Sequence, residues 1–187
     1  AEGEVHADTL YARLALEAAI EKISPHPGLA HFYVHLMEMA PRKSLVQRAC
    51  AQANILRRQY PACGHLLHMA SHIDLQLGSY CAAMDSNLAA IQQDDDVSRL
   101  TAVGRNTYYH GYRLHNHHML CYAAMFAGQS ALALSTAEEA FQITPAALID
   151  SYIDYLEPHM ANPWHALIRF GRWEELLVRT VDFDTDK

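Results

Sequence analysis

Histidine recurs in this chain at fixed distances before a glycine corner. Three segments of similar sequence, GSYCAA, GQSALA and GRWEEL, begin at Gly78, Gly128 and Gly171. The residues six, ten and thirteen positions before Gly78 are all histidines, as are two of the three before Gly128 and one before Gly171. If Pro41 marks an earlier corner, the residues six and ten positions before it are histidines too. The aligned histidines are His31, His35, His65, His68, His72, His115, His118 and His165.

This alignment is unlike a chance distribution. Eight of the chain's 13 histidines fall in the twelve aligned positions, whereas random placement would put about one there. The alignment at Pro41 is set by its own histidines, whereas the alignments at Gly78 and Gly128 are set by glycine alone. In these two, five of the six aligned positions are histidines. The histidines therefore occupy an equivalent position in a repeated structure.

Aligned imidazoles of this kind are suited to holding metal ions. Histidine is the usual metal ligand among side chains, and two on one helix face, three or four residues apart, can bind one ion. A second helix would supply the third ligand. Glu38 shares the stripe of His31 and His35 and is a candidate carboxylate ligand. We expect one or two ions, copper in preference to zinc or iron, held by a subset of the eight aligned histidines with Glu38.

Two other interpretations stay open for the aligned histidines: a groove that binds an anionic ligand or peptide through imidazolium, and structural hydrogen bonding. A metal site should weaken as the pH falls through about 6.5, whereas an imidazolium site should strengthen. The remaining histidines are expected to be ordinary packing residues. His117 should face away from the stripe of His115 and His118, since helical rotation places it about 160° from His115. These packing histidines are His6, His26, His110, His117 and His159.

The histidines must be positioned by helices. Alternating β-patterns are absent, and helical periodicity, rich in alanine and leucine, is interrupted by proline and glycine. The acidic run at Asp94 is expected to be a solvated helix end or loop, inside a polar loop at 94–107. The expected helices are 8–23, 29–39, 42–58, 65–77, 80–93, 109–126, 131–143, 146–157, 164–170 and 173–179.

The glycine corners resemble those of tetratricopeptide repeats. Gly78, Tyr80 and Ala83, followed by Ala90, match the Gly-x-Tyr-x-x-Ala pattern of that family. The resemblance covers about 29–179, although the glycine corners are 50 and 43 residues apart, against about 34 in a regular array. Segments 26–40, 64–78 and 169–177 are similar to a histidine-rich branch of these proteins.

The resemblance implies an all-α fold. Four antiparallel helical hairpins would stack as one tetratricopeptide-like solenoid domain over 1–187, with the first helix of each hairpin lining a concave groove. It implies no particular reaction.

Composition excludes several classes of protein. The chain has 187 residues, 51% of them hydrophobic and 19% charged, as expected of one globular domain. A net charge of −7 argues against nucleic-acid binding, and no apolar stretch approaches the roughly 20 residues of a membrane span. The start at Ala1 leaves room for an upstream segment such as a removed signal peptide. Four cysteines without a C-x-x-C pair slightly favour the cytoplasm.

Two functions follow from these patterns. One is a copper- or iron-dependent oxidoreductase whose substrate lies in the groove beside the metal; a hydrolase fits less well, since Glu38 is the one evident carboxylate base. The other is a non-catalytic module, either a scaffold for a peptide or anionic partner or a metal-storage protein. No phosphate-binding glycine loop and no serine or cysteine nucleophile motif is present.

Overall fold

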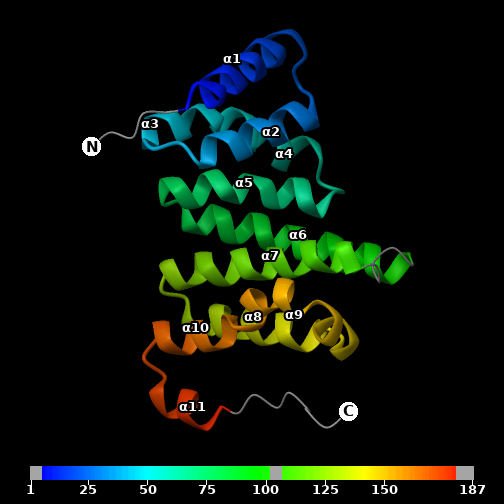
Figure 1. Ribbon diagram of the computed structural model, residues 1–187, viewed down its shortest axis with the longest axis vertical. Helices are drawn as coiled ribbons and strands as arrows, with labels where there is room; N and C mark the ends of the chain where they lie inside the picture. Colours follow the sequence, from blue (N-terminus) through cyan, green and yellow to red (C-terminus); the bar gives the residue numbers. More distant parts are fainter. Residues whose placement is uncertain (1–5, 102–106, 180–187) are drawn as a thin grey trace.

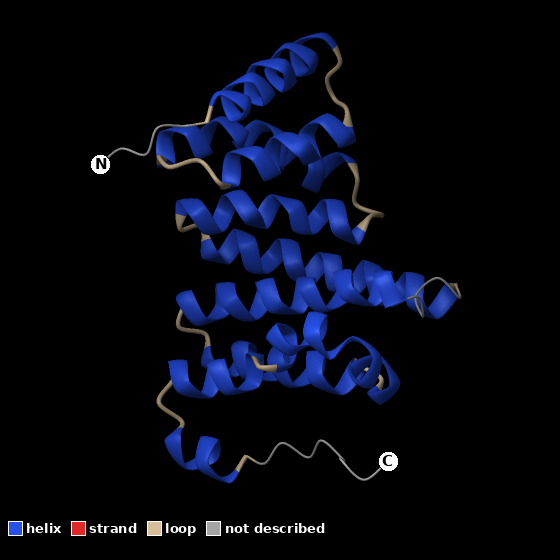
Figure 2. Cartoon of the chain, in the orientation of Figure 1, coloured by secondary structure: helices blue, strands red, loops and turns tan. Residues whose placement is uncertain are grey.

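The computed structural model describes residues 6–101 and 107–179, and all regular secondary structure in these two ranges is helical (Figure 2). The all-α prediction is confirmed for this part of the chain. α1 lies at one end of the long axis and α11 at the other, with α5, α6 and α7 between them (Figure 1). They are α1 Ala7–Lys22, α2 Pro27–Glu38, α3 Lys43–Val46, the 3₁₀ helix η1 Gln47–Ala49, α4 Cys50–Gln59, α5 Gly64–Leu77, α6 Tyr80–Leu100, α7 Thr107–Phe126, α8 Ser130–Ile143, α9 Ala146–Met160, α10 Asn162–Arg169 and α11 Trp173–Val178.

Helices that are neighbours in the sequence are also neighbours in space. α5 packs against α6, α6 against α7 and α7 against α8, while α2 packs against both α4 and α5. Figure 1 shows α5, α6 and α7 side by side across the long axis. One apolar core joins α2, α4 and α5, and a second joins α6, α7, α8 and α10. These cores fix the relative positions of α2, α5 and α7, which carry the candidate site. None of the described helices is long and apolar enough to cross a membrane.

Glycine ends the first helix of three hairpins, as the sequence predicts. After Gly78, the Ser79 N–H donates to the carbonyl of Asp74 over 2.8 Å, which closes the end of α5. A left-handed backbone is costly for any residue with a Cβ, so glycine is favoured at this position. The three corner glycines have φ angles of 83°, 72° and 65° and are Gly78, Gly128 and Gly171.

The prediction for the acidic run is wrong. α6 continues to Leu100 instead of ending near residue 93, and the Asp94 side chain is buried against α7. Its carboxylate accepts hydrogen bonds from the Tyr109 hydroxyl over 2.8 Å and from Asn116 Nδ2 over 2.7 Å. Burial raises the pKa of Asp94. Partners 15 and 22 residues away could not be read from local sequence. Residues 102–106 of the expected loop lie outside the described residues.

Two further predicted helices differ in detail. The expected helix at 42–58 is three short pieces, α3, η1 and α4. The helix after Pro145 extends to Met160, and Tyr152 within it has a non-helical φ of −138°. The other boundaries differ from the prediction by a few residues.

Gly64 lets α5 and α6 approach at the start of α5. A Cβ at this position would lie 2.9 Å from the carbonyl oxygen of Ala90 and would overlap the carboxylate of Asp94. Both neighbours are on α6, and Asp94 is itself held by its bonds to α7. The contact therefore has little room to relax.

Gly64→Ala should lower the free energy of unfolding by about 1–3 kcal/mol, the usual cost of forcing a methyl group into a packed contact. Urea unfolding monitored by circular dichroism would measure the loss. Gln76→Ala, an exposed substitution on the same helix, should change little. Equal stability of the two variants would contradict the close approach of α5 and α6.

Candidate metal centre

Histidines from α2, α5 and α7 converge on one cluster. The ring centroids of His35 and His72, from α2 and α5, are 5.3 Å apart. Those of His68 and His115, from α5 and α7, are 4.6 Å apart. Helices separated by 30 or more residues in the sequence thus bring their imidazoles into contact. The histidine cluster consists of His31, His35, Glu38, His65, His68, His72 and His115.

One group in the cluster, the α2 site, consists of His31, His35 and His65. Each residue offers a ring nitrogen, and these nitrogens lie within 4.8 Å of one another. The Nε2 atoms of His31 and His65 are 3.0 Å apart. The side chain of His35 is 42% exposed. Solvent or a ligand can therefore reach the α2 site at His35.

A second group, the α5 site, consists of His68, His72 and His115. Its three ring nitrogens also lie within 4.8 Å of one another, and the Nε2 atoms of His68 and His72 are 2.9 Å apart. His68 is fully buried, and the side chain of His72 is 11% exposed. The α5 site is the more enclosed of the two.

Asn87 determines where the proton of His68 lies. Asn87 Nδ2 donates to the carbonyl of Ala83 over 2.8 Å, so its Oδ1 is the atom 2.7 Å from His68 Nδ1. An amide oxygen can only accept. His68 therefore donates from Nδ1, and Nε2 of the neutral ring keeps its lone pair.

Glu38 orients one histidine of each site. Its Oε1 accepts from Nδ1 of His35 over 2.7 Å, and its Oε2 accepts from Nδ1 of His72. Burial alone would raise the pKa of Glu38, but the bonds and charges of the two rings lower it to about 2. The ionised carboxylate accepts from both Nδ1 atoms, so Nε2 of His35 and Nε2 of His72 are the nitrogens left to face other partners.

In the α5 site two ring nitrogens face each other: Nε2 of His68 and Nε2 of His72 are 2.9 Å apart. A contact this short requires a proton or a metal ion between the two nitrogens. Burial and the neighbouring imidazoles keep the pKa of His68 well below 6.5, which disfavours a proton on His68.

The spacing of these nitrogens fits the coordination shell of a metal ion. Zn–N bonds of about 2.0–2.1 Å put two ligands about 2.9 Å apart at a right angle and about 3.3 Å apart at the tetrahedral angle. The Nε2 pairs of the α5 site and the α2 site are separated by 2.9 Å and 3.0 Å. A carboxylate or amide on the far nitrogen is the usual support of a metal-bound histidine.

Several imidazoles of the cluster have lowered pKa values. Burial, aided by neighbouring rings, lowers the pKa of His65 to about 4 and that of His115 to about 3. Burial also lowers the pKa of His31. These rings are uncharged near pH 7, which is the form that binds metal and not the form that attracts anions.

Two of the predicted ligands lie beside the cluster. His118 and His165 belong to none of the groups with metal-ligand spacing among the described residues. The ring of His118 is 6.5 Å from that of His115, and His165 is exposed. His159, expected to be a packing residue, lies with its ring 5.2 Å from that of His118. Since His159 stands at none of the three offsets from a glycine corner, the repeat pattern gave no signal for it.

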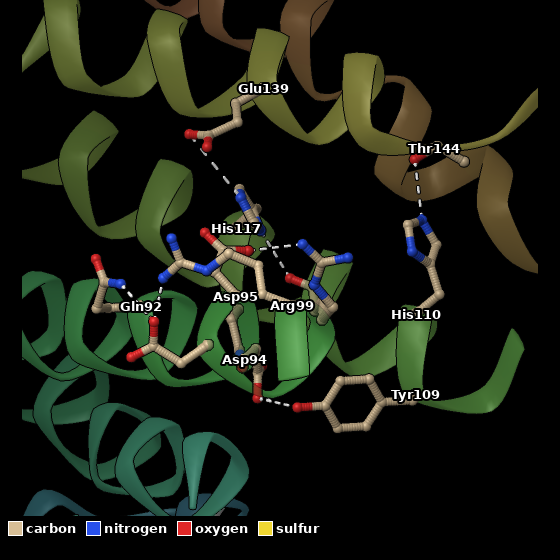
Figure 3. Close-up of polar contacts among 12 residues, drawn as sticks. Gln92, Asp94, Asp95, Arg99, Tyr109, His110, His117, Glu139 and Thr144 are labelled. Atoms are coloured by element: carbon tan, nitrogen blue, oxygen red, sulfur yellow. Dashed lines mark hydrogen bonds and ion pairs between the residues drawn. The ribbon is translucent and has the colours of Figure 1, made fainter. Parts of the chain in front are cut away.

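His117 faces away from the cluster, as predicted. Its Nδ1 donates to the carbonyl of Arg113 over 2.8 Å, and its Nε2 lies 4.0 Å from Oε2 of Glu139 on α8. His110, two turns earlier, has Nε2 3.4 Å from Oγ1 of Thr144 (Figure 3). Both rings belong to the packing of α7 against α8. His6 and His26 accept hydrogen bonds from the backbone at the starts of α1 and α2.

Comparisons with known proteins returned no relatives: no protein-family model, no curated protein and no solved structure matches the chain. The function of the histidine cluster is therefore inferred from its own geometry.

Metal-free protein should lose stability as the pH falls from about 6.5 toward about 4. The lowered pKa values of His65 and His115 mean that the unfolded chain binds protons in this range before the folded chain does. Urea unfolding at a series of pH values would measure the slope. In His115→Gln, the free energy of unfolding should depend less steeply on pH, by the equivalent of close to one proton. Identical slopes for the two proteins would contradict the lowered pKa of His115.

Proposed function

We propose that this protein binds two transition-metal ions, one in the α2 site and one in the α5 site. The observation that carries this proposal is the 2.9 Å separation of Nε2 of His68 and Nε2 of His72, on two rings that Asn87 and Glu38 orient through Nδ1. A metal ion would take both Nε2 atoms as ligands. The protein supplies a prepared pair of ligands, and His115 is close enough to complete the set.

Glu38 acts in this proposal as the shared support of both sites. Because its two oxygens hold Nδ1 of His35 and Nδ1 of His72, it fixes one ligand of each site in the orientation that binding needs. A shift in the position or charge of either ring alters its bond to the carboxylate, and the carboxylate passes this change on to its bond with the other ring. The two sites are expected to fill in a linked manner.

The donor set favours copper, with zinc and iron as the alternatives. All six ligands are imidazoles, which suit these ions and not magnesium or calcium. The groups with metal-ligand spacing among the described residues include no cysteine. Both sites offer three ligands, so each would leave a coordination position open, as in catalytic metal sites.

An oxidoreductase is the reaction class that these sites fit best. Copper or iron bound by three imidazoles can exchange electrons and activate dioxygen at the open position. The residues would hold the ions, keep Glu38 ionised and limit access of water to the buried α5 site. Tyr112 packs against His65 with ring centroids 4.6 Å apart, which places a phenol beside the α2 site.

We assign the helical hairpins to the tetratricopeptide-like class on one further observation. His31 and His65 are 34 residues apart and in contact, and so are Glu38 and His72. This is the length of one regular repeat of that class. Contacts between equivalent positions of α2 and α5 are what stacked repeats would produce.

A non-catalytic scaffold that holds an anionic peptide through imidazolium has less support. His65, His68 and His115 have pKa values lowered by burial. Neutral rings provide no positive charge near pH 7 for such a partner.

Copper titration should show two ions per chain, measured by elemental analysis after removal of free metal. His72→Ala should lower the stoichiometry to about one ion, because it removes a ligand of the α5 site. His165→Ala, an exposed histidine of the same aligned set, should still bind two. A wild-type chain that binds no copper, zinc or iron, or equal losses in the two variants, would overturn the proposal.

The bound metal should be retained well below pH 6.5, since protons compete poorly for rings with lowered pKa values. Affinity should fall as the pH drops further toward about 4, when His65 becomes protonated. Competition with a chelator at several pH values would give the midpoint. Loss of all bound metal centred at about 6.5, the ordinary histidine value, would show that the ions are not held by the buried rings of His65, His68 and His115.

A further inference from the structure

A cavity of about 570 Å³ opens beside His35, between α1, the end of α2 and the segment that leads to α3. This volume is typical of sites for small organic molecules, about 300–1,000 Å³. Its wall is mainly apolar. The apolar side chains include Leu10, Leu36, Met39, Pro41 and Leu45.

One charged residue, Arg13, lines the cavity without a matching acid. Its Nε is buried and has no hydrogen-bond partner, and no ion pair with Arg13 is formed in the described part of the chain. Among the described residues, no aspartate or glutamate lines the cavity, although the chain as a whole carries a net charge of −7. A buried donor left unpaired is costly. Arg13 is therefore positioned to bind an anion that enters from solvent.

The same cavity reaches the α2 site. His35 is one of its lining residues, and the side chain of His35 is 42% exposed while Glu38 holds its Nδ1. A molecule in the cavity would contact an imidazole whose orientation is fixed by that bond. The cavity is thus lined by the Arg13 cation, by an apolar wall and by His35, which is a proposed metal ligand of the α2 site.

We propose that this cavity binds a small organic carboxylate with an apolar body, the carboxylate on Arg13 and the apolar body against Leu36, beside the α2 site. A guanidinium matches a carboxylate through paired N–H donors. A neutral apolar molecule would leave Arg13 unpaired, and a cation would be repelled by it. The role of this molecule as the substrate of the metal sites rests on the proposed function, whereas its binding does not.

The binding can be tested on metal-free protein with three probes of equal chain length: octanoate, octanol and octyltrimethylammonium. Isothermal titration should show octanoate binding at least about tenfold more tightly than the other two. Arg13→Gln should abolish that preference, while Arg58→Gln, an exposed arginine on α4, should preserve it. Circular dichroism would confirm that both variants are folded.

Three results would overturn the assignment: no binding of octanoate, equal binding of octanoate and octanol, or an unchanged preference in Arg13→Gln. A second measurement adds octanoate to copper-loaded protein and records the copper electron paramagnetic resonance spectrum. A change that depends on Arg13 would support the position beside the α2 site, and an unchanged spectrum would contradict it. If the chain binds octanoate through Arg13 but binds no copper, the proposed function is refuted. The assignment of the cavity as a carboxylate-binding site would still hold.

Discussion

The hydrogen bonds on the Nδ1 atoms of His35, His68 and His72 determine what the rest of this structure can do. Glu38 and Asn87 accept these bonds, so Nε2 of each ring is the nitrogen that faces away from them. The packing of α5 then brings Nε2 of His68 to 2.9 Å from Nε2 of His72. Burial penalises the protonated form of His68, and a metal ion is the partner that we propose for this pair of nitrogens.

The fold could be predicted from the sequence to the extent that its signals are local. Helical periodicity and the glycines at 78, 128 and 171 located most helices and the three corners, because a left-handed turn after a helix favours glycine. The continuation of α6 through the acidic run could not be predicted. It depends on the Asp94 carboxylate meeting Tyr109 and Asn116 from the next helix, and that pairing exists only once α6 and α7 have packed.

The sequence could predict which histidines belong to the candidate site, but not how they divide into two groups. Fixed offsets identified the histidines of the cluster, since equivalent positions of stacked helices fall on one side. On a helix, His65, His68 and His72 fall on one face as a single stripe. In the structure the stripe is divided: His65 is grouped with His31 and His35 of α2, His68 with His115 of α7, and His72 contacts both helices. Asn87 had no sequence signal at all, since its role depends on an amide orientation set by the carbonyl of its own helix.

Crystals of copper-loaded protein, measured at the copper absorption edge, would locate the ions directly. Two anomalous peaks are expected, each bonded to imidazole nitrogens at about 2.0–2.1 Å. One peak should join Nε2 of His68 to Nε2 of His72, with Glu38 still on Nδ1 of His35 and Nδ1 of His72. An ion bonded to Glu38 itself, or no peak between His68 and His72, would contradict the two-site arrangement.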